Sequence, residues 1–245
     1  MEIVRTHINR FYAKSVASDG IPPQFLKRKG WRAYASEPFN YSLGEALGLN
    51  ASVRARMPDL NFPTPAKHSP RVVVGKWYCP YIFVKEGDQV KDQMRKSMFY
   101  EMTLEQCWEE IYTRENCYGE GKIVEFGVGV VRERTLLNGS EDVKDNTEIE
   151  DGMVWFKSAD SLGNGLGLSL LIWERMRWEQ ARGGWVSGEK KVERVERVEA
   201  GEGESGWKKF GCYVLVERFV LKRMHGKIAL ICEFKHTDKI RIRWE

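Results

Sequence analysis

The stretch FGCYVLVERFVLKRMHGKIALICEFKH, residues 210–236, limits the possible folds more than any other part of this chain. Two runs of β-branched and aromatic residues flank His225-Gly226, where the backbone can take the positive φ angles that a two-residue turn needs. Counting outward from this turn gives three cross-strand pairs, Leu221–Leu230, Phe219–Cys232 and Arg218–Glu233. The stretch therefore predicts a β-hairpin with one apolar face and one polar or paired face.

The segment MTLEQCWEEIYTREN, residues 102–116, has the features of a capped helix. Thr103 can accept a hydrogen bond from the backbone three residues later, while Gln106 reaches back toward it. The apolar residues then recur at helical spacing, at Leu104, Cys107, Trp108, Ile111 and Tyr112. We therefore expect a helix from Thr103 to Arg114 with its glutamates facing water.

A second helix is expected from Ser169 to Arg182, because Ser169 can cap its start and Gly183-Gly184 can end it. The apolar residues from Leu168 onward also alternate as they would in a strand, so a strand remains the alternative.

Other segments are rich in β-branched and aromatic residues and predict strands. They are RVVVGKWYCPYIFVKEGD as two segments, KIVEFGVGVVRER, MVWFK and the final KIRIRWE. Residues 138–152 and 189–206 are highly charged, so we expect a mobile acidic loop and a flexible loop there. The expected fold is α+β, with a twisted antiparallel sheet of about six to eight strands covered by one or two helices.

A chain of 245 residues can bury one sizeable core. Residues 1–57 are basic and poorly patterned, and residues 58–70 hold four of the eight prolines, as expected of a linker or an extended strap. The core domain is therefore expected to cover residues 71–245.

The five cysteines are an odd number and lack the spacing of a disulfide framework, which favours a reducing compartment. We expect a cytoplasmic or nuclear protein, because no apolar leader opens the chain and no run approaches the length of a membrane span. The basic amphipathic start leaves an organellar transit peptide as the alternative. A net charge of +4 does not require a polyanionic partner.

Four long phrases carry a family resemblance, namely GKWYCPYIFVKEGD, MFYEMTLEQCWEEIY, ERMRWEQARGGWV and GWKKFGCYVLVERFVLKRMHGKIALICEFKHTDKIRIRWE. Through them, residues 52–245 resemble the plant family called "domain of unknown function 1262". The resemblance implies a plant origin and an intracellular protein. It implies no catalytic residue and no cofactor, because that family has no established activity.

The glycine-rich stretch GNGLGLS raises the question of a phosphate-binding loop. Its glycines, Gly163, Gly165 and Gly167, match neither the dinucleotide nor the nucleoside triphosphate template, and no lysine follows them. The backbone before Ser169 could still hold an anion at a helix start. A flexible entry loop is the preferred interpretation, and no cofactor is expected.

Metal and catalytic sites are poorly supported. The possible metal ligands Cys212, His225, Cys232 and His236 lack the spacing of a zinc site, so no metal is expected. A Cys79 thiol with His236 as base, and a carboxylate pair of Glu174 and Glu179, remain catalytic alternatives. The chain is therefore expected to be non-enzymatic, although an enzyme whose site cannot be recognised from sequence remains an alternative.

Basic residues suggest the remaining binding surface. Arg175, Arg177 and Arg182 interleave with tryptophans, and Lys239, Arg241 and Arg243 form one face of the final strand. They could bind nucleic acid or anionic lipid, but nearby glutamates weaken the field and nucleic acid is judged an unlikely partner. By elimination, we expect a protein-binding or scaffold module.

Overall fold

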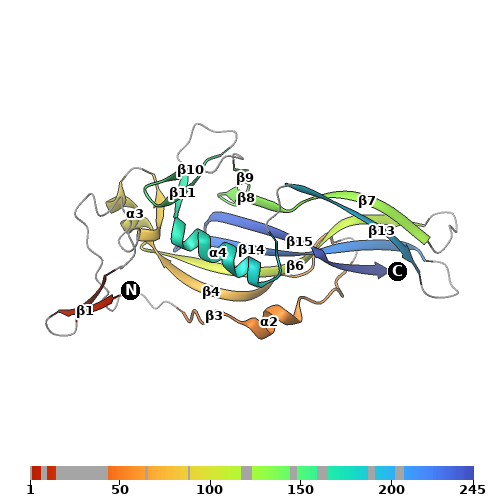
Figure 1. The fold of residues 1–245 in the computed structure, drawn as a ribbon, viewed down its shortest axis with the longest axis horizontal. Helices are drawn as coiled ribbons and strands as arrows, with labels where there is room; N and C mark the ends of the chain where they lie inside the picture. The colour runs from red at the N-terminus through yellow and green to blue at the C-terminus, as the bar shows by residue number, and fades with distance from the viewer. Residues whose placement is uncertain are drawn as a thin grey trace.

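The structure, a computed structural model, describes residues 2–6, 10–14, 44–63, 66–87, 89–116, 123–143, 148–158, 165–186, 191–201 and 207–245 (Figure 1). Gly163 therefore lies outside the described residues. Within these ranges, no helix combines the length and the apolar character needed to cross a bilayer.

A seven-stranded antiparallel sheet forms the centre of the molecule, in the order β3-β4-β6-β14-β15-β8-β9. Its strands are β3 (Gly48–Leu49), β4 (Val72–Pro80), β6 (Phe99–Glu115), β14 (Lys209–Arg223), β15 (Ile228–Trp244), β8 (Glu133–Leu137) and β9 (Glu141–Asp142). The long strands β6, β14 and β15 run along the long axis of the molecule (Figure 1).

Three smaller sheets accompany it. One has the order β10-β11-β12-β5, from β10 (Glu148–Glu150), β11 (Met153–Phe156), β12 (Leu166–Ser169) and β5 (Val84–Glu86). The others are two-stranded, β13 (Val192–Ala200) with β7 (Ile123–Val131), and β1 (Glu2–Thr6) with β2 (Arg10–Lys14). The described helices are α2 (Ala51–Arg56), the 3-10 turn η1 (Tyr81–Phe83), α3 (Val90–Lys96) and α4 (Leu170–Arg182).

The predicted C-terminal hairpin is confirmed, including its register. β14 and β15 place Leu221 opposite Leu230, Phe219 opposite Cys232 and Arg218 opposite Glu233. The turn is wider than two residues, since Arg223 N–H donates to the Lys227 carbonyl and only Gly226 in it has a positive φ, of 83°. Glycine accepts this φ without the steric cost that a Cβ would bring.

The predicted α+β fold is wrong, because most of the described chain is in strands and the first expected helix does not exist. Residues 103–114 belong to β6, the strand between β4 and β14. Both neighbours hydrogen-bond to β6, and its side chains from Met102 to Trp108 are buried. An apolar spacing that suits a helix therefore belongs to a strand whose two faces are both covered.

The two expected charged loops are also wrong in part. Residues 192–200, VERVERVEA, form strand β13, which pairs with β7 along its whole length. Within 138–152, the short strands β9 and β10 interrupt the acidic stretch. Much of the surface of these strands faces water, and charged side chains are common on such exposed outer strands.

The second expected helix is confirmed as α4, which lies across one face of the long sheet (Figure 1). Its Met176, and Trp185 just beyond it, belong to the main core together with Phe219 and Phe234 of the sheet. Each large apolar side chain buried in this way contributes roughly 1.5–3 kcal/mol. α4 ends at Arg182, with Gly183 as its C-cap, and Gly184 takes a φ of 92°.

The described parts of the proline-rich segment, residues 58–63 and 66–70, lie against the sheet. Residues 66–70 continue the line of β4 beside β6, since Glu110 N–H donates to the Lys67 carbonyl and Ser69 N–H to the Trp108 carbonyl. The indole of Trp108 donates to the Pro58 carbonyl at 2.8 Å. These contacts bury Phe62 and cover the ring of Trp108.

Candidate functional site

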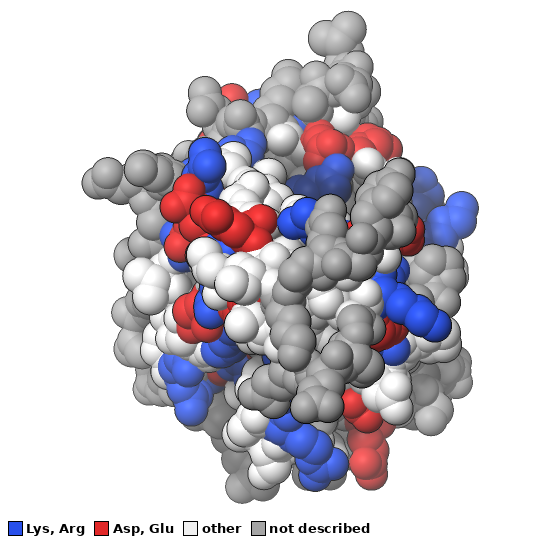
Figure 2. Space-filling model, turned by 90° about the vertical axis from the view of Figure 1, so that its right-hand side faces the viewer, with Lys and Arg blue, Asp and Glu red and all other residues white. Residues whose placement is uncertain are grey.

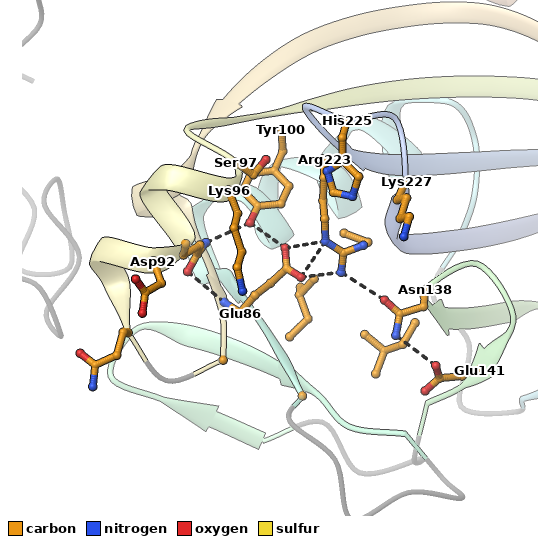
Figure 3. A pocket seen from close by; sticks show the side chains of 17 residues that line it. Glu86, Asp92, Lys96, Ser97, Tyr100, Asn138, Glu141, Arg223, His225 and Lys227 are labelled. Carbon is orange, nitrogen blue, oxygen red and sulfur yellow. Dashed lines mark hydrogen bonds and ion pairs between the residues drawn. The ribbon is translucent and has the colours of Figure 1, made fainter.

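A pocket of about 650 Å³ opens at the end of the long sheet near α3 and the β14–β15 turn (Figure 3). Its walls come from β5, α3, the start of β6, the β8–β9 turn, β12 and the hairpin turn. The volume lies within the range of about 300–1,000 Å³ that small-molecule sites occupy.

Antiparallel pairing explains why distant parts of the chain meet here. β14 ends at Arg223, and this residue pairs with Tyr100 near the start of β6. Glu86 is the last residue of β5, which α3 follows directly in the sequence. The pocket is therefore built where several strands and one helix begin or end.

The carboxylate of Glu86, at the centre of the pocket, accepts hydrogen bonds on both oxygens from neighbouring side chains (Figure 3). The Tyr100 hydroxyl donates to Oε1 of Glu86 at 2.6 Å, and Nε of Arg223 donates to Oε2 at 2.8 Å. Nη2 of Arg223 donates to the same Oε2. Because both oxygens of Glu86 accept internal hydrogen bonds, this carboxylate is not placed to take a proton from a substrate.

Gln93 orients the network from α3. Its Nε2 donates to the Val84 carbonyl at 2.7 Å and to the Tyr100 hydroxyl at 3.0 Å, while its Oε1 accepts from Glu86 N–H at 3.1 Å. Burial, reinforced by the hydrogen bond to Glu86, raises the pKa of Tyr100 far above its usual range. The phenol therefore stays protonated and acts as a donor.

At the rim of the pocket the acidic side chains have partners within the protein, whereas several basic side chains have none among the described residues. Asn138 Nδ2 donates to Glu141 at 3.0 Å, and Asp92 lies 3.7 Å from Arg95. In contrast, the exposed side chains of Lys96, His225 and Lys227 make no hydrogen bond or ion pair with other residues that the structure describes. The groups available to a ligand at this rim are therefore mainly cationic.

A second polar cluster lies buried between α2, α4 and the sheet. Arg54 donates from Nε to Oε1 of Glu217 at 2.8 Å and from Nη2 to Oε2 at 2.5 Å. Gln106 Nε2 donates to the same Oε1 at 2.7 Å, and Nε2 of His236 lies 3.5 Å from Oε2. Both Glu217 and His236 are 1% exposed. A bidentate arginine offsets much of the cost of burying this carboxylate.

Burial by itself would raise the pKa of Glu217. The side chains of His236 and Arg54 favour the carboxylate more strongly, so the pKa lies well below its usual range. Glu217 is therefore charged over the whole physiological range. Gly183 packs directly against the guanidinium of Arg54, so that a Cβ at this position would lie 2.1 Å from Nη2. Only glycine leaves room for this contact.

The six basic residues singled out in the sequence contact other parts of the protein. Arg175 and Arg182 flank the ring of Trp178, with their Cζ atoms 3.9 and 4.6 Å from its centroid. Arg177 donates to Glu133 at 2.9 Å.

On β15, Lys239 donates to the Gly183 carbonyl, Arg241 lies 5.2 Å from the Trp108 ring centroid, and Arg243 donates to the Phe62 carbonyl at 2.6 Å. Lys239 of β15 thus contacts the end of α4, Arg241 packs on Trp108 of β6, and Arg243 contacts the segment before β4. Figure 2 shows acidic side chains interspersed with the basic ones at this end of the molecule, outside the grey regions.

The glycine stretch leads into a strand instead of a helix. Gly167 lies in β12, and Ser169, at the junction with α4, is buried and makes no side-chain cap. A Cβ on Gly165 would lie 2.5 Å from the Phe156 carbonyl oxygen, because β11 passes close beside it. The glycines described here allow close strand packing.

The candidate metal ligands and thiols are dispersed. Cys212 belongs to the cluster under the β7–β13 ribbon, whereas His225 lies at the pocket rim and His236 beside Glu217. Among the described residues, no three His, Cys, Asp or Glu side chains gather as a metal site. Burial raises the pKa of Cys79 to about 12, which opposes formation of a nucleophilic thiolate.

Sequence patterns could have revealed the buried cluster but not the pocket. Glu217 stands in the apolar row of Leu215, Phe219 and Leu221, and His236 ends the corresponding row on β15, so each is a polar residue on a buried face. The pocket, in contrast, joins Glu86 to Arg223, 137 residues apart. No local pattern links these two residues.

No protein-family model and no curated protein matches this chain. Among solved structures, the chain is similar to the crystal structure of Cry35Ab1, with a TM-score of 0.43 and 11% sequence identity. The similar region covers 86% of this chain and 52% of Cry35Ab1, so the chain spans about half the length of that protein. Similarity at this level does not indicate a function, and the resemblance to the domain of unknown function 1262 stays a prediction.

Proposed function

We propose that this protein is a non-enzymatic binding protein whose pocket at the end of the sheet holds a small phosphorylated or sulfated molecule. The supporting observation is the division of charge at the pocket. Its acids are engaged internally, whereas the side chains of Lys96, His225 and Lys227 make no ion pair or hydrogen bond with other described residues. These three side chains can contribute donors to an anion, as arginine and lysine do in phosphate sites.

The pocket itself argues for binding without chemistry. Glu86 is held by Tyr100 and Arg223, and the tyrosine keeps its proton. A general base must reach the proton that it abstracts, and this carboxylate is already hydrogen-bonded on both oxygens. The same network gives the pocket a fixed polar floor beneath the cationic rim.

The test is calorimetric titration with glucose 6-phosphate, with glucose as the neutral partner. Glucose 6-phosphate should bind and glucose should bind at least tenfold more weakly, because a hydrogen bond to a charged group is worth about 1.5–3 kcal/mol. Lys96→Ala and Lys227→Ala should each weaken binding by about tenfold, and added salt should weaken it further.

Lys91→Ala is the matched control, since Lys91 is exposed on the same helix but does not line the pocket. It should leave the affinity within about twofold of wild type. Equal binding of glucose and its phosphate, or equal effects of Lys91→Ala and Lys96→Ala, would contradict the anion proposal.

Protein binding through α4 is a second candidate. Trp178 is 45% exposed and lies between the guanidinium groups of Arg175 and Arg182, which hold the ring in place. Exposed aromatic and arginine side chains are enriched in protein interfaces. A pull-down should lose specific proteins with Trp178→Ser and keep them with Leu47→Ser, another exposed apolar site. Identical retention by both variants would exclude this face.

A further inference from the structure

The two-stranded ribbon of β7 and β13 has an edge without a partner strand. β13 pairs with β7 along Val192–Ala200, and no other strand that the structure describes pairs with its opposite edge. The ribbon lies at the same end of the molecule as the C-terminus (Figure 1). An unpaired strand edge presents backbone N–H and C=O groups that can bind a further strand.

β13 is the more exposed of the two strands. On the face of the ribbon that packs against the long sheet, the β7 side chains Val124, Phe126 and Val130 are buried. Glu193 and Arg197 of β13 lie directly opposite Val130 and Phe126 and share this face, yet their side chains are 45% and 44% exposed. The long sheet therefore covers β7 more completely than β13, which leaves the outer edge of β13 open to solvent.

The sequence of β13 is complementary to itself. Residues 192–198 read VERVERV, so two copies that run antiparallel about Val195 bring every valine opposite a valine and every glutamate opposite an arginine. Opposite Val192, Glu193, Arg194 and Val195 of one copy stand Val198, Arg197, Glu196 and Val195 of the partner subunit. Opposite charges that face each other across strands stabilise a sheet.

The charges select this register over its neighbours. For a two-fold axis to keep the same face of both ribbons toward their own subunits, the axis must pass beside one residue of β13. Centring the pair on Arg194 or on Glu196 would place that residue directly opposite the same residue of the partner subunit. Like charges in this position are destabilising. Charges on an outer strand generally discourage edge pairing, but here their order favours pairing about Val195.

Apolar side chains on the outer face would be covered by the same pairing. Val131, Val192 and Val198 are all exposed, and Val131 lies opposite Val192 within one subunit. Val198 of the partner subunit extends this pair into a row of three valines, and the two-fold axis forms the row twice. Removing such apolar surface from water favours association.

The charged residues can change partners at little cost. Arg194 Nε lies 2.6 Å from Glu196 Oε1 within one subunit, and both side chains are largely exposed. An exposed ion pair contributes little to stability, so its exchange for a pair across the edge is not opposed. Glu193 also contacts Arg132 and Thr237 of its own subunit, and Arg194 and Glu196 therefore give the cleaner test.

We propose that this protein forms a two-fold symmetric dimer in which β13 pairs antiparallel with β13 of a second copy, centred on Val195. The two ribbons then form one continuous sheet in the order β7-β13-β13-β7. An interface of this short length is weak, so the dimer depends on protein concentration. The surface is separate from the pocket at the other end of the sheet, since no residue of β7 or β13 lines that pocket.

Sedimentation velocity on the full chain from about 1 μM to about 1 mM should show a monomer that becomes a dimer, the range in which weak complexes dissociate. Arg194→Glu and Glu196→Arg should each weaken the dimer about tenfold, because two symmetry-related pairs change from attraction to repulsion. A monomer at every concentration would overturn the proposal, and so would a dimer that neither charge reversal weakens.

An equimolar mixture of the two charge-reversed variants is the decisive measurement. Position 194 of one variant and position 196 of the other again carry opposite charges, so the mixed dimer should recover the wild-type affinity to within about twofold. Neither a folding defect nor loss of the ion pair within one strand can be repaired by mixing. Failure of the mixture to recover would overturn the register.

A matched pair of valine and isoleucine variants tests the apolar contact. Val198 is 66% exposed and lies at the proposed junction, whereas Ile123 is 65% exposed and lies on β7 opposite Ala200. Val198→Ser should weaken the dimer about fivefold or more, and Ile123→Ser should change its affinity by less than about twofold. Near-ultraviolet circular dichroism will show that each variant folds. Equal effects of the two folded variants would place the contact elsewhere and overturn the proposal.

Discussion

Arg54 holds both carboxylate oxygens of Glu217, although the two residues are 163 positions apart in the sequence. Arg54→Met should lower the free energy of unfolding by about 3–5 kcal/mol, because it leaves a buried charge without its main partner. Urea unfolding followed by tryptophan fluorescence measures this loss.

The double variant Arg54→Met with Glu217→Leu is the control for this prediction. It removes both charges, and replacing a buried ion pair by apolar residues is often neutral. The double variant should therefore recover most of the stability lost in the single one. If the double variant loses as much stability as the single variants Arg54→Met and Glu217→Leu lose together, the two side chains are not energetically coupled.

The depressed pKa of Glu217 predicts a defined pH dependence. A carboxylate whose pKa is lower in the folded than in the unfolded chain stabilises the fold above its ordinary pKa of 4.5. That stability is lost as the pH falls below 4.5 toward the folded pKa. Unfolding free energies measured from pH 7 down to pH 3 should therefore fall more steeply in wild type than in Glu217→Gln. Parallel curves would contradict the prediction.

Buried thiols predict slow chemical modification. Burial raises the pKa of Cys79 to about 12 and the pKa of Cys107 and Cys212 to about 11, and it raises the pKa of Cys232 further. A Cys117→Ser variant isolates these four thiols. At pH 8 it should react with a disulfide reagent only at the rate of unfolding, and four equivalents should react at once in denaturant. Rapid reaction of the folded variant would show that at least one thiol is accessible.

Tyr100 predicts the opposite pH dependence. Its pKa is raised by burial and by Glu86 above the ordinary value of 10.0, so its contribution to stability is complete below pH 10 and is lost as the pH rises above it. Tyr100→Phe should cost about 1–3 kcal/mol at pH 7, where buried partners lose a hydrogen bond. The difference in free energy of unfolding between Tyr100→Phe and wild type should be smaller at pH 10.5 than at pH 7. Urea unfolding at both pH values measures this difference. A gap that widens there would refute this assignment.

The hairpin could be predicted because its local signals agree. The strands of β14 and β15 carry large apolar side chains at matching positions, and Gly226 supplies the turn. The pair of Arg218 and Glu233 then fixes which residues face each other. Register follows from this stretch alone, without knowledge of the rest of the fold.

β6 could not be predicted, because its polar residues are buried. Glu105 pairs with Arg218 at 2.8 Å and Gln106 donates to Glu217, so these side chains satisfy one another across strands. The sequence rule that polar residues face water thus fails where both faces of a strand are covered. The partners lie on β14, far along the chain, and they cannot be identified from the segment itself.

Pairing between β6 and β14 also determines when this protein can fold. Arg218 and Glu105, which meet across these strands, are 113 residues apart, and β14 and β15 come last in sequence among the described strands. Until β14 has been made, the edge of β6 that faces β14 lacks its pairing strand and is a site for misassociation. Sheets built from such non-local pairs fold in about milliseconds to seconds, so the edge of β6 toward β14 is covered later than its edge toward β4.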